Sequence, residues 1–188
     1  KANNLRDPEI FEKFAFYIVS IAQAKRITKE FELHGRFYAI DSTTIDLCLS
    51  VFRWAKFRST KSGIKIHTQI DIATEIPVFY RISHANVHDT KSMDWFTYER
   101  NACYVLDRGY FDLSRLHAIG KAGVFFIIRE KFHPDYEITE GEDMLEGDDN
   151  VLRDQTVRFT GKRNSGNYPI PLRRIVFFAT DLGRTFTY

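Results

Sequence analysis

The chain has 188 residues, of which 44% are hydrophobic, and its formal net charge is +2. This composition excludes a wholly disordered chain and predicts one globular domain that could contain an insertion. The small net charge does not by itself require a nucleic-acid partner, and no apolar run is long enough to span a bilayer. Two cysteines far apart in the sequence, without zinc-site spacing, predict reduced thiols in a cytoplasmic protein.

The first predicted element is a helix over about residues 8–32, ending near Gly35. An Asp-Pro pair at its start resembles an N-cap followed by proline at the first helical position, and apolar residues then recur at helical spacing. The next run, 36–41, is apolar and predicts a buried strand that ends at Asp41.

A β-hairpin is predicted next, with strands over 64–69 and 78–82. In its first strand, isoleucines alternate with Lys65 and His67. This alternation places Lys65 and His67 on the face opposite the isoleucines, where they could approach a phosphate or a metal-bound water. The alternative is that His67 is a strand-surface residue without a role.

Two further apolar strands are predicted, one ending at Asp107 and one over 123–129. Asp112 is the predicted N-cap of the helix between them, which ends at Gly120 or Gly123, and Asp89 is the predicted cap of a short helix before them. The order of elements is strand, hairpin, helix, strand, helix, strand. This order is typical of an α/β fold with a mixed sheet.

The chain changes character after this region. Between Glu130 and Asp149 nine acidic residues accompany a single lysine, which predicts an irregular, solvated segment. Strands over 154–161 and 173–181 are then expected to pair antiparallel, and the final residues are also strand-like. This tail is interpreted as a β-rich insertion.

Asp41 and Asp107 share a context, because each ends an apolar run and precedes turn-forming residues. In an open α/β sheet, ligands bind at the carboxyl ends of the strands, so two parallel neighbours would present both carboxylates at one edge. Paired carboxylates can hold Mg²⁺, and two such ions can activate a water for phosphoryl displacement. The alternative is that each aspartate only caps a turn.

Three stretches together resemble the bacterial insertion-sequence transposases of the IS-four type: AIDSTTIDLCLSVFRWAKFRSTKSGIKIHTQID, SHANVHD and YVLDRGYFDLSRL. They occur in the family's order and with similar gaps along the chain. The resemblance implies a ribonuclease H-like α/β core with an antiparallel β-rich insertion and an Asp-Asp-Glu triad. It implies that Asp41 is the first triad acid and Asp107 the second.

The sequence departs from the family at the third acid of the triad, the glutamate. Its pattern is Tyr-x-x-Arg-x-x-x-Glu-x-x-x-x-x-x-Lys, and no tyrosine of this sequence has arginine three residues later. The glutamate is therefore expected beyond Tyr188, and the 188 residues are expected to be inactive by themselves. The expected divisions are an N-terminal helix over 1–35, a partial catalytic core over 36–130 and a partial insertion over 131–188.

The resemblance implies DNA strand cleavage and strand transfer in DNA transposition, with two Mg²⁺ or Mn²⁺ ions in the complete site. The implied partners are double-stranded DNA, as transposon ends and target, and further copies of the protein on that DNA. The implied location is the bacterial cytoplasm, at the nucleoid.

Basic residues interleaved with aromatic ones follow Asp41 and favour binding of a DNA backbone and stacking on bases. The alternative is a solvated loop whose aromatic residues fold into the core. The predicted DNA-binding residues are Arg53, Lys56, Arg58, Lys61, Lys65, His67, Arg108 and Tyr110.

Three other functions fit parts of the sequence. A nuclease of the same fold would cleave without joining strands, and a non-catalytic DNA-binding remnant is compatible with the missing glutamate. An aspartate-based phosphatase would use Asp41 as nucleophile, but Thr43 stands where such enzymes usually place a second aspartate.

Overall fold

The computed structural model of the chain describes residues 6–25, 35–48, 56–58, 61–131, 135–143 and 150–188. It divides into two compact units, Lys1–Asn86 and Val87–Tyr188, and each is described by itself. In the described residues, none of the helices has the length and hydropathy that a membrane crossing requires.

The first unit begins with helix α1 (Pro8–Lys25). The Asp7 carboxylate accepts a hydrogen bond from the Glu9 N–H at 3.0 Å, in agreement with the predicted N-cap. Phe16 of α1 stacks on Tyr80, with ring centroids 5.0 Å apart. The rest of the helix predicted to residue 32 lies outside the described residues.

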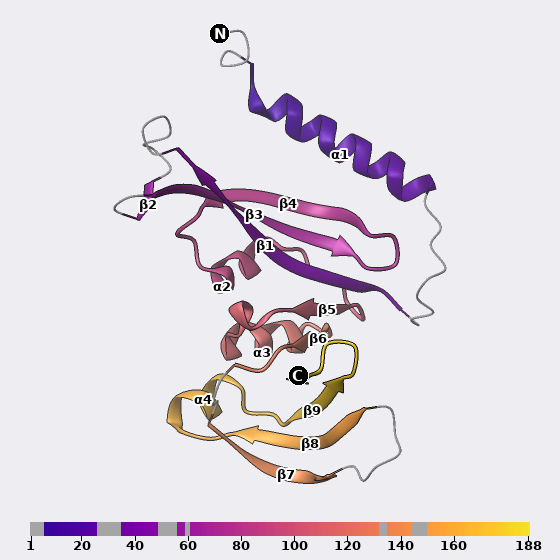
Figure 1. Cartoon of the computed structure of the whole chain (residues 1–188), viewed down its shortest axis with the longest axis vertical. Helices are drawn as coiled ribbons and strands as arrows, with labels where there is room; N and C mark the ends of the chain where they lie inside the picture. Colours follow the sequence, from indigo (N-terminus) through magenta and orange to yellow (C-terminus); the bar gives the residue numbers. More distant parts are fainter. Residues whose placement is uncertain (1–5, 26–34, 49–55, 59–60, 132–134, 144–149) are drawn as a thin grey trace. The chain divides into compact units, whose positions relative to one another are not determined.

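The sheet of the first unit is an antiparallel meander with its second long strand in the middle, and Figure 1 shows the three long strands side by side. The predicted hairpin is confirmed, although both of its strands are longer than predicted. A short strand precedes it and pairs with its beginning. The strands are β1 (Phe37–Leu47), β2 (Lys56–Arg58), β3 (Lys61–Asp71) and β4 (Ile76–His84).

Strand β1 was predicted to end at Asp41, but it continues to Leu47. Tyr38 and Ile40 are buried, whereas most side chains from Asp41 onward are exposed. The prediction was based on the apolar run in the sequence, and the buried part of the strand does end at Ile40. The strand continues because its antiparallel hydrogen-bonded pairing with β3 extends to Leu47.

The face of β3 that carries His67 is buried, which corrects the expectation that His67 could reach DNA. His67 has no exposed surface, and its Nε2 lies 2.9 Å from Ser83 Oγ on β4. On the opposite face, Ile82 is 56% exposed beside Ile66. The predicted alternation is therefore present, but alternation does not tell which face of a strand is covered.

The second unit contains two strands joined by a helix, as predicted, and the structure shows that these two strands pair in parallel. Strands β5 (Cys103–Leu106) and β6 (Phe125–Ile128) pair in parallel, and α3 (Leu113–Lys121) connects them. Leu116 and two other apolar residues of α3 are buried. The Asp112 carboxylate accepts the Arg115 N–H at 3.1 Å, so the predicted N-cap is confirmed.

Two short helices precede this pair, α2 (Asp89–Ser92) and the 3₁₀ helix η3 (Met93–Trp95). The prediction that Asp89 caps the first of them is wrong. His88 occupies the N-cap position, and its Nδ1 accepts the Thr90 N–H at 3.3 Å. Asp89 is instead the first helical residue, where a carboxylate is favoured by the helix dipole.

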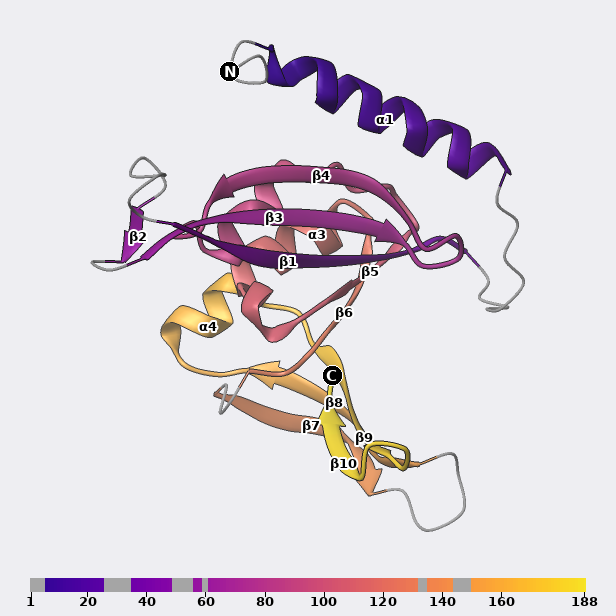
Figure 2. The same ribbon diagram turned by 45° about the horizontal axis from the view of Figure 1, so that its top comes forward.

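A second sheet follows, with the strand order β10-β9-β8-β7 and antiparallel pairing throughout. Figure 2 shows β10 beside β9. The helix α4 (Lys162–Asn167), between β8 and β9, was not predicted. The strands are β7 (Tyr136–Asp143), β8 (Val151–Phe159), β9 (Leu172–Ala179) and β10 (Arg184–Thr187).

Strand β7 contradicts the prediction that the acidic segment is irregular from residue 135 onward. Most of its side chains are exposed, so the amino-acid composition of this strand resembles that of a loop. Its order comes from the backbone ladder with β8, in which Glu137 pairs with Arg158 and Asp143 with Arg153. An edge strand rich in charge is also protected from pairing with other chains.

These elements confirm the predicted fold class, a ribonuclease H-like α/β arrangement with an additional antiparallel β-rich part. The antiparallel meander belongs to the first unit, and the parallel β5–α3–β6 segment belongs to the second.

Candidate active site

Asp41 lies on β1 of the first unit, opposite Thr68 of β3. It is the first exposed residue after the buried part of the strand. The strand pairing on β3 fixes the backbone at this position, so the direction of the carboxylate is set by a regular element rather than by a loop. Asp46, also exposed, lies farther along the same strand.

Asp107 lies in the second unit, directly after β5 and before the 3₁₀ helix η4 (Arg108–Tyr110). Its side chain is 55% exposed and makes no capping hydrogen bond to η4. Since β5 pairs in parallel with β6, the carboxylate stands at the carboxyl end of a parallel pair, where ligands bind in α/β sheets.

Asp112 lies in the same segment, and its hydrogen bonds can be compared with those of Asp107. One of its oxygens caps α3, and the other accepts a hydrogen bond from Arg115 Nη1 at 2.9 Å. Asp112 thus has a structural use that accounts for its presence. The absence of a capping bond at Asp107 removes the turn-cap explanation for that residue.

Gly109 leaves room for another carboxylate in this region. A Cβ atom at Gly109 would lie 3.2 Å from Asp89 Oδ2, closer than most side-chain contacts. A glycine fits here because the backbone of η4 passes directly against Asp89.

Arg129 follows β6 as Asp107 follows β5, and the sequence analysis missed it. Its Nη1 lies 3.9 Å from Asp107 Oδ1, and its guanidinium lies over the Phe186 ring, 4.9 Å from the centroid. No local signal marked it, because its contacts with Asp107 and Phe186 join residues that are distant in the sequence.

The predicted DNA-binding residues differ in burial and in position. Tyr110 is only 1% exposed and belongs to the core, so we no longer assign it to a DNA surface. Lys65 is half-buried, and Arg108 is half-buried after β5. Lys56 and Arg58 form β2 with one residue between them, and Lys61 begins β3. Arg53 lies outside the described residues.

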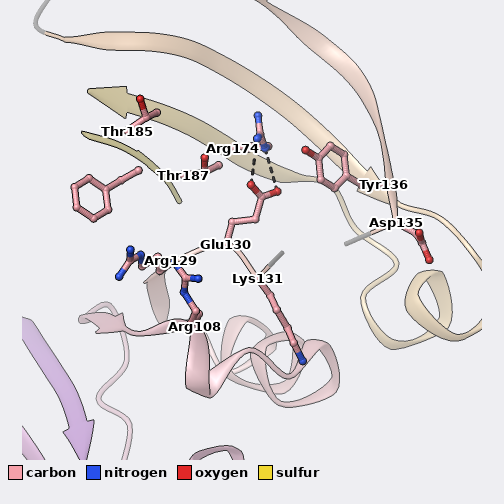
Figure 3. Close-up of a pocket in the computed structure, with 10 residues that line it drawn as sticks. Arg108, Arg129, Glu130, Lys131, Asp135, Tyr136, Arg174, Thr185 and Thr187 are labelled. Carbon is pink, nitrogen blue, oxygen red and sulfur yellow. Dashed lines mark hydrogen bonds and ion pairs between the residues drawn. The ribbon is translucent and has the colours of Figure 1, made fainter. Parts of the chain in front are cut away.

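A cavity of about 480 Å³ lies at the ends of β5 and β6, within the second unit. Figure 3 shows its side chains, which come from the residues after these strands and from the second sheet. Glu130 accepts two hydrogen bonds from Arg174, at 3.2 and 3.1 Å. Burial, followed by the Glu130 charge, raises the pKa of Tyr136 at the cavity wall, so its hydroxyl remains protonated.

Carboxylate oxygens, such as those of Asp41 and those of Asp107, are ligands of the kind that a hard divalent cation prefers. Mg²⁺ is usually held by one or two carboxylates and keeps several waters or substrate oxygens. In the described part of the chain, no group of three or more His, Cys, Asp and Glu side chains could hold a metal ion.

Comparison with known proteins identifies the family to which the chain belongs. The family model described as transposase DDE domain matches residues 32–177. A protein of Sinorhizobium fredii (strain NBRC 101917 / NGR234) named as a transposase, y4zB, is 34% identical over 151 residues, which is 79% of the chain. The chain spans 42% of the length of that relative. The chain belongs to the transposase DDE domain family.

Proposed function

We propose that this chain is the catalytic core of a transposase that cleaves DNA at the ends of a mobile element and joins the freed 3′ ends to target DNA. The exposed carboxylate of Asp107 carries this proposal, because it follows a parallel strand and has no capping role. The family match supports the same function.

In this proposal, Asp41 and Asp107 together hold Mg²⁺ or Mn²⁺, with two ions in the complete site. Such ions lower the pKa of a bound water and stabilise charge on the oxygens of the phosphate. The chain's own part is to fix two carboxylates on regular elements, at the middle of β1 and the end of β5. No covalent bond between protein and DNA is needed.

The partners in this proposal are double-stranded DNA, as element ends and target, and further copies of the protein on the same DNA. Lys65 and the basic residues of β2 and β3 would contact the phosphate backbone, which supplies affinity without sequence preference. The protein would act at the bacterial nucleoid. Since no glutamate here fits the family pattern, only two triad residues are assigned.

The test is Mg²⁺-dependent cleavage of labelled element-end DNA by the protein in its full length. We expect Asp41→Asn and Asp107→Asn each to reduce the cleavage rate by about 10³-fold or more, because each removes a charged metal ligand. Asp46→Asn is the matched control, since Asp46 is exposed on the same strand as Asp41. Normal cleavage by either active-site variant would disprove the assignment.

The same experiment separates transposition from hydrolysis. A labelled 3′ end that appears covalently joined to an unlabelled target supports strand transfer. Cleavage without any joined product would indicate a nuclease of the same fold. Salt-sensitive DNA binding with no metal-dependent cleavage would indicate a non-catalytic DNA-binding protein.

A further inference from the structure

We propose that the cavity at the ends of β5 and β6 binds a backbone phosphate of the DNA strand that is processed at Asp107, with Arg129 as the principal contact. This proposal deepens the proposed function and rests on it, because it takes the strand at Asp107 to be DNA.

The first argument is the charge of the cavity. Its lining contains four cations, Arg108, Arg129, Lys131 and Arg174, and two carboxylates, Glu130 and Asp135. Arg174 is committed to the wall, because it donates two hydrogen bonds to Glu130 and a third, at 2.8 Å, to Gln155. The remaining excess of positive charge in a concave surface attracts an anion.

The second argument is the state of Arg129. Its 3.9 Å separation from Asp107 is longer than a charge-assisted hydrogen bond, which measures about 2.7–2.9 Å. The two groups therefore attract each other without a hydrogen bond. At this distance the donors of the planar guanidinium are not committed to Asp107, so they can bind phosphate oxygens in a bidentate manner.

The third argument is that Arg129 is held in place on both sides. Its N–H donates to Leu106 O at 3.2 Å, which extends the β5–β6 ladder, and the next N–H, of Glu130, donates to Thr187 O at 2.8 Å. The Glu130–Arg174 pair is largely buried, with side chains 19% and 15% exposed. A side chain on a fixed backbone loses less entropy when it binds a ligand.

The fourth argument is the position of a second cation. Arg108 directly follows Asp107, and in Figure 3 its guanidinium and that of Arg129 project to the same side of the cavity. Two like charges that share a surface repel each other, and an anion between them lowers this repulsion. A phosphodiester is the anion that must lie beside Asp107 if this carboxylate acts on DNA.

The test is equilibrium binding of a fluorescent DNA duplex to the full-length protein in EDTA, at several salt concentrations. Arg129→Gln is compared with Arg184→Gln. Arg184 is a matched control, because its guanidinium also lies over the Phe186 ring, at 4.7 Å, but does not line the cavity. We expect Arg129→Gln to lower the salt-dependence slope by about 1, as loss of one phosphate contact does, and Arg184→Gln to leave it unchanged.

A second measurement excludes a merely structural effect of the substitution. Calorimetric titration with Mn²⁺ in the absence of DNA should give equal or tighter binding for Arg129→Gln, because a cation near the metal ligand has been removed. Weakened Mn²⁺ binding together with weakened DNA binding would show general disruption and would overturn the proposal. An unchanged salt slope, or the same loss in Arg184→Gln, would also overturn it.

The binding assay contains no metal, so it is independent of cleavage. Loss of the phosphate contact in Arg129→Gln, with normal cleavage by Asp107→Asn, would support the cavity and refute the catalytic assignment. The reverse pattern would refute the cavity and leave the proposed function standing.

Discussion

Aspartates in one short segment of the second unit have different environments. Asp112 uses both carboxylate oxygens within the fold, for the α3 cap and for Arg115. Asp107 is more exposed and is approached by Arg129 only at 3.9 Å. A carboxylate with spare oxygen lone pairs at a strand end is available to a metal ion, whereas one used in a cap is not.

Asp94 provides a prediction of pH-dependent stability. Hydrogen bonds from Arg115, at 3.0 and 2.8 Å, lower the Asp94 pKa below its ordinary value of 3.8. The stability that this pair contributes is therefore present above the ordinary pKa and is lost as the pH falls through the lower, folded-state pKa. Because the Asp94 side chain is 59% exposed, the contribution is at most about 1 kcal/mol.

Urea unfolding of Asp94→Asn measures this contribution. We expect a lower free energy of unfolding than in the wild type at neutral pH, and no difference below the folded-state pKa. Asp181→Asn is the control, since Asp181 lies on an exposed turn and should show no such change. A deficit in Asp94→Asn that stays constant down to acidic pH would contradict the explanation.

Single residues were predictable where local sequence determines their role. The cap at Asp112 and the strand-end position of Asp107 depend on neighbours in sequence. His67 and Tyr110 were misjudged because burial depends on which face the rest of the fold covers. Arg129 was missed because its importance comes from Phe186 and Asp107, which are distant in sequence.

At the scale of elements, β7 depends on a glycine. Gly141 has φ 122°, and a Cβ atom there would lie too close to the backbone oxygen of Asp154 on β8. Gly183 also has a positive φ, of 59°, but no atom lies within 4 Å of its Cβ position. Alanine carries a conformational cost at both positions, and the cost is larger at Gly141 because φ 122° lies outside the left-handed region that L residues adopt. The two positions also differ in steric space.

This difference gives a prediction for the second sheet. Gly141→Ala should reduce the free energy of unfolding by about 1–3 kcal/mol more than Gly183→Ala, because the β7 backbone must move away from β8. Chemical denaturation of the two variants measures the difference. Equal destabilisation would contradict the close approach of β7 to β8 at Gly141.

Elements with a strong local pattern were predicted well. The β3–β4 hairpin, the strands β5 and β6 and the α3 helix followed from alternation, apolar runs and a cap. The extension of β1 and the whole of β7 were not predicted, because both are exposed strands. Pairing with a neighbouring strand holds them, and a single sequence does not show that neighbour.

At the scale of the whole molecule, the two aspartates of the proposed metal site lie in different units of the chain. Asp41 belongs to the first unit and Asp107 to the second, and each lies on or directly after a strand of its own unit. The sequence indicated this pair through the spacing of strand ends and through resemblance to a family. Local patterns could not supply the cavity or Arg129, which depend on how the second sheet meets the end of β6.

The most direct test of the central claim is a calorimetric Mn²⁺ titration of the full-length protein, with Asp41→Asn, Asp107→Asn and the double variant. If both carboxylates hold the same ions, each single substitution should remove most of the binding, and the double variant should lose little more. Two independent losses, each removing a separate part of the binding, would contradict the account, as would unchanged binding in either single variant.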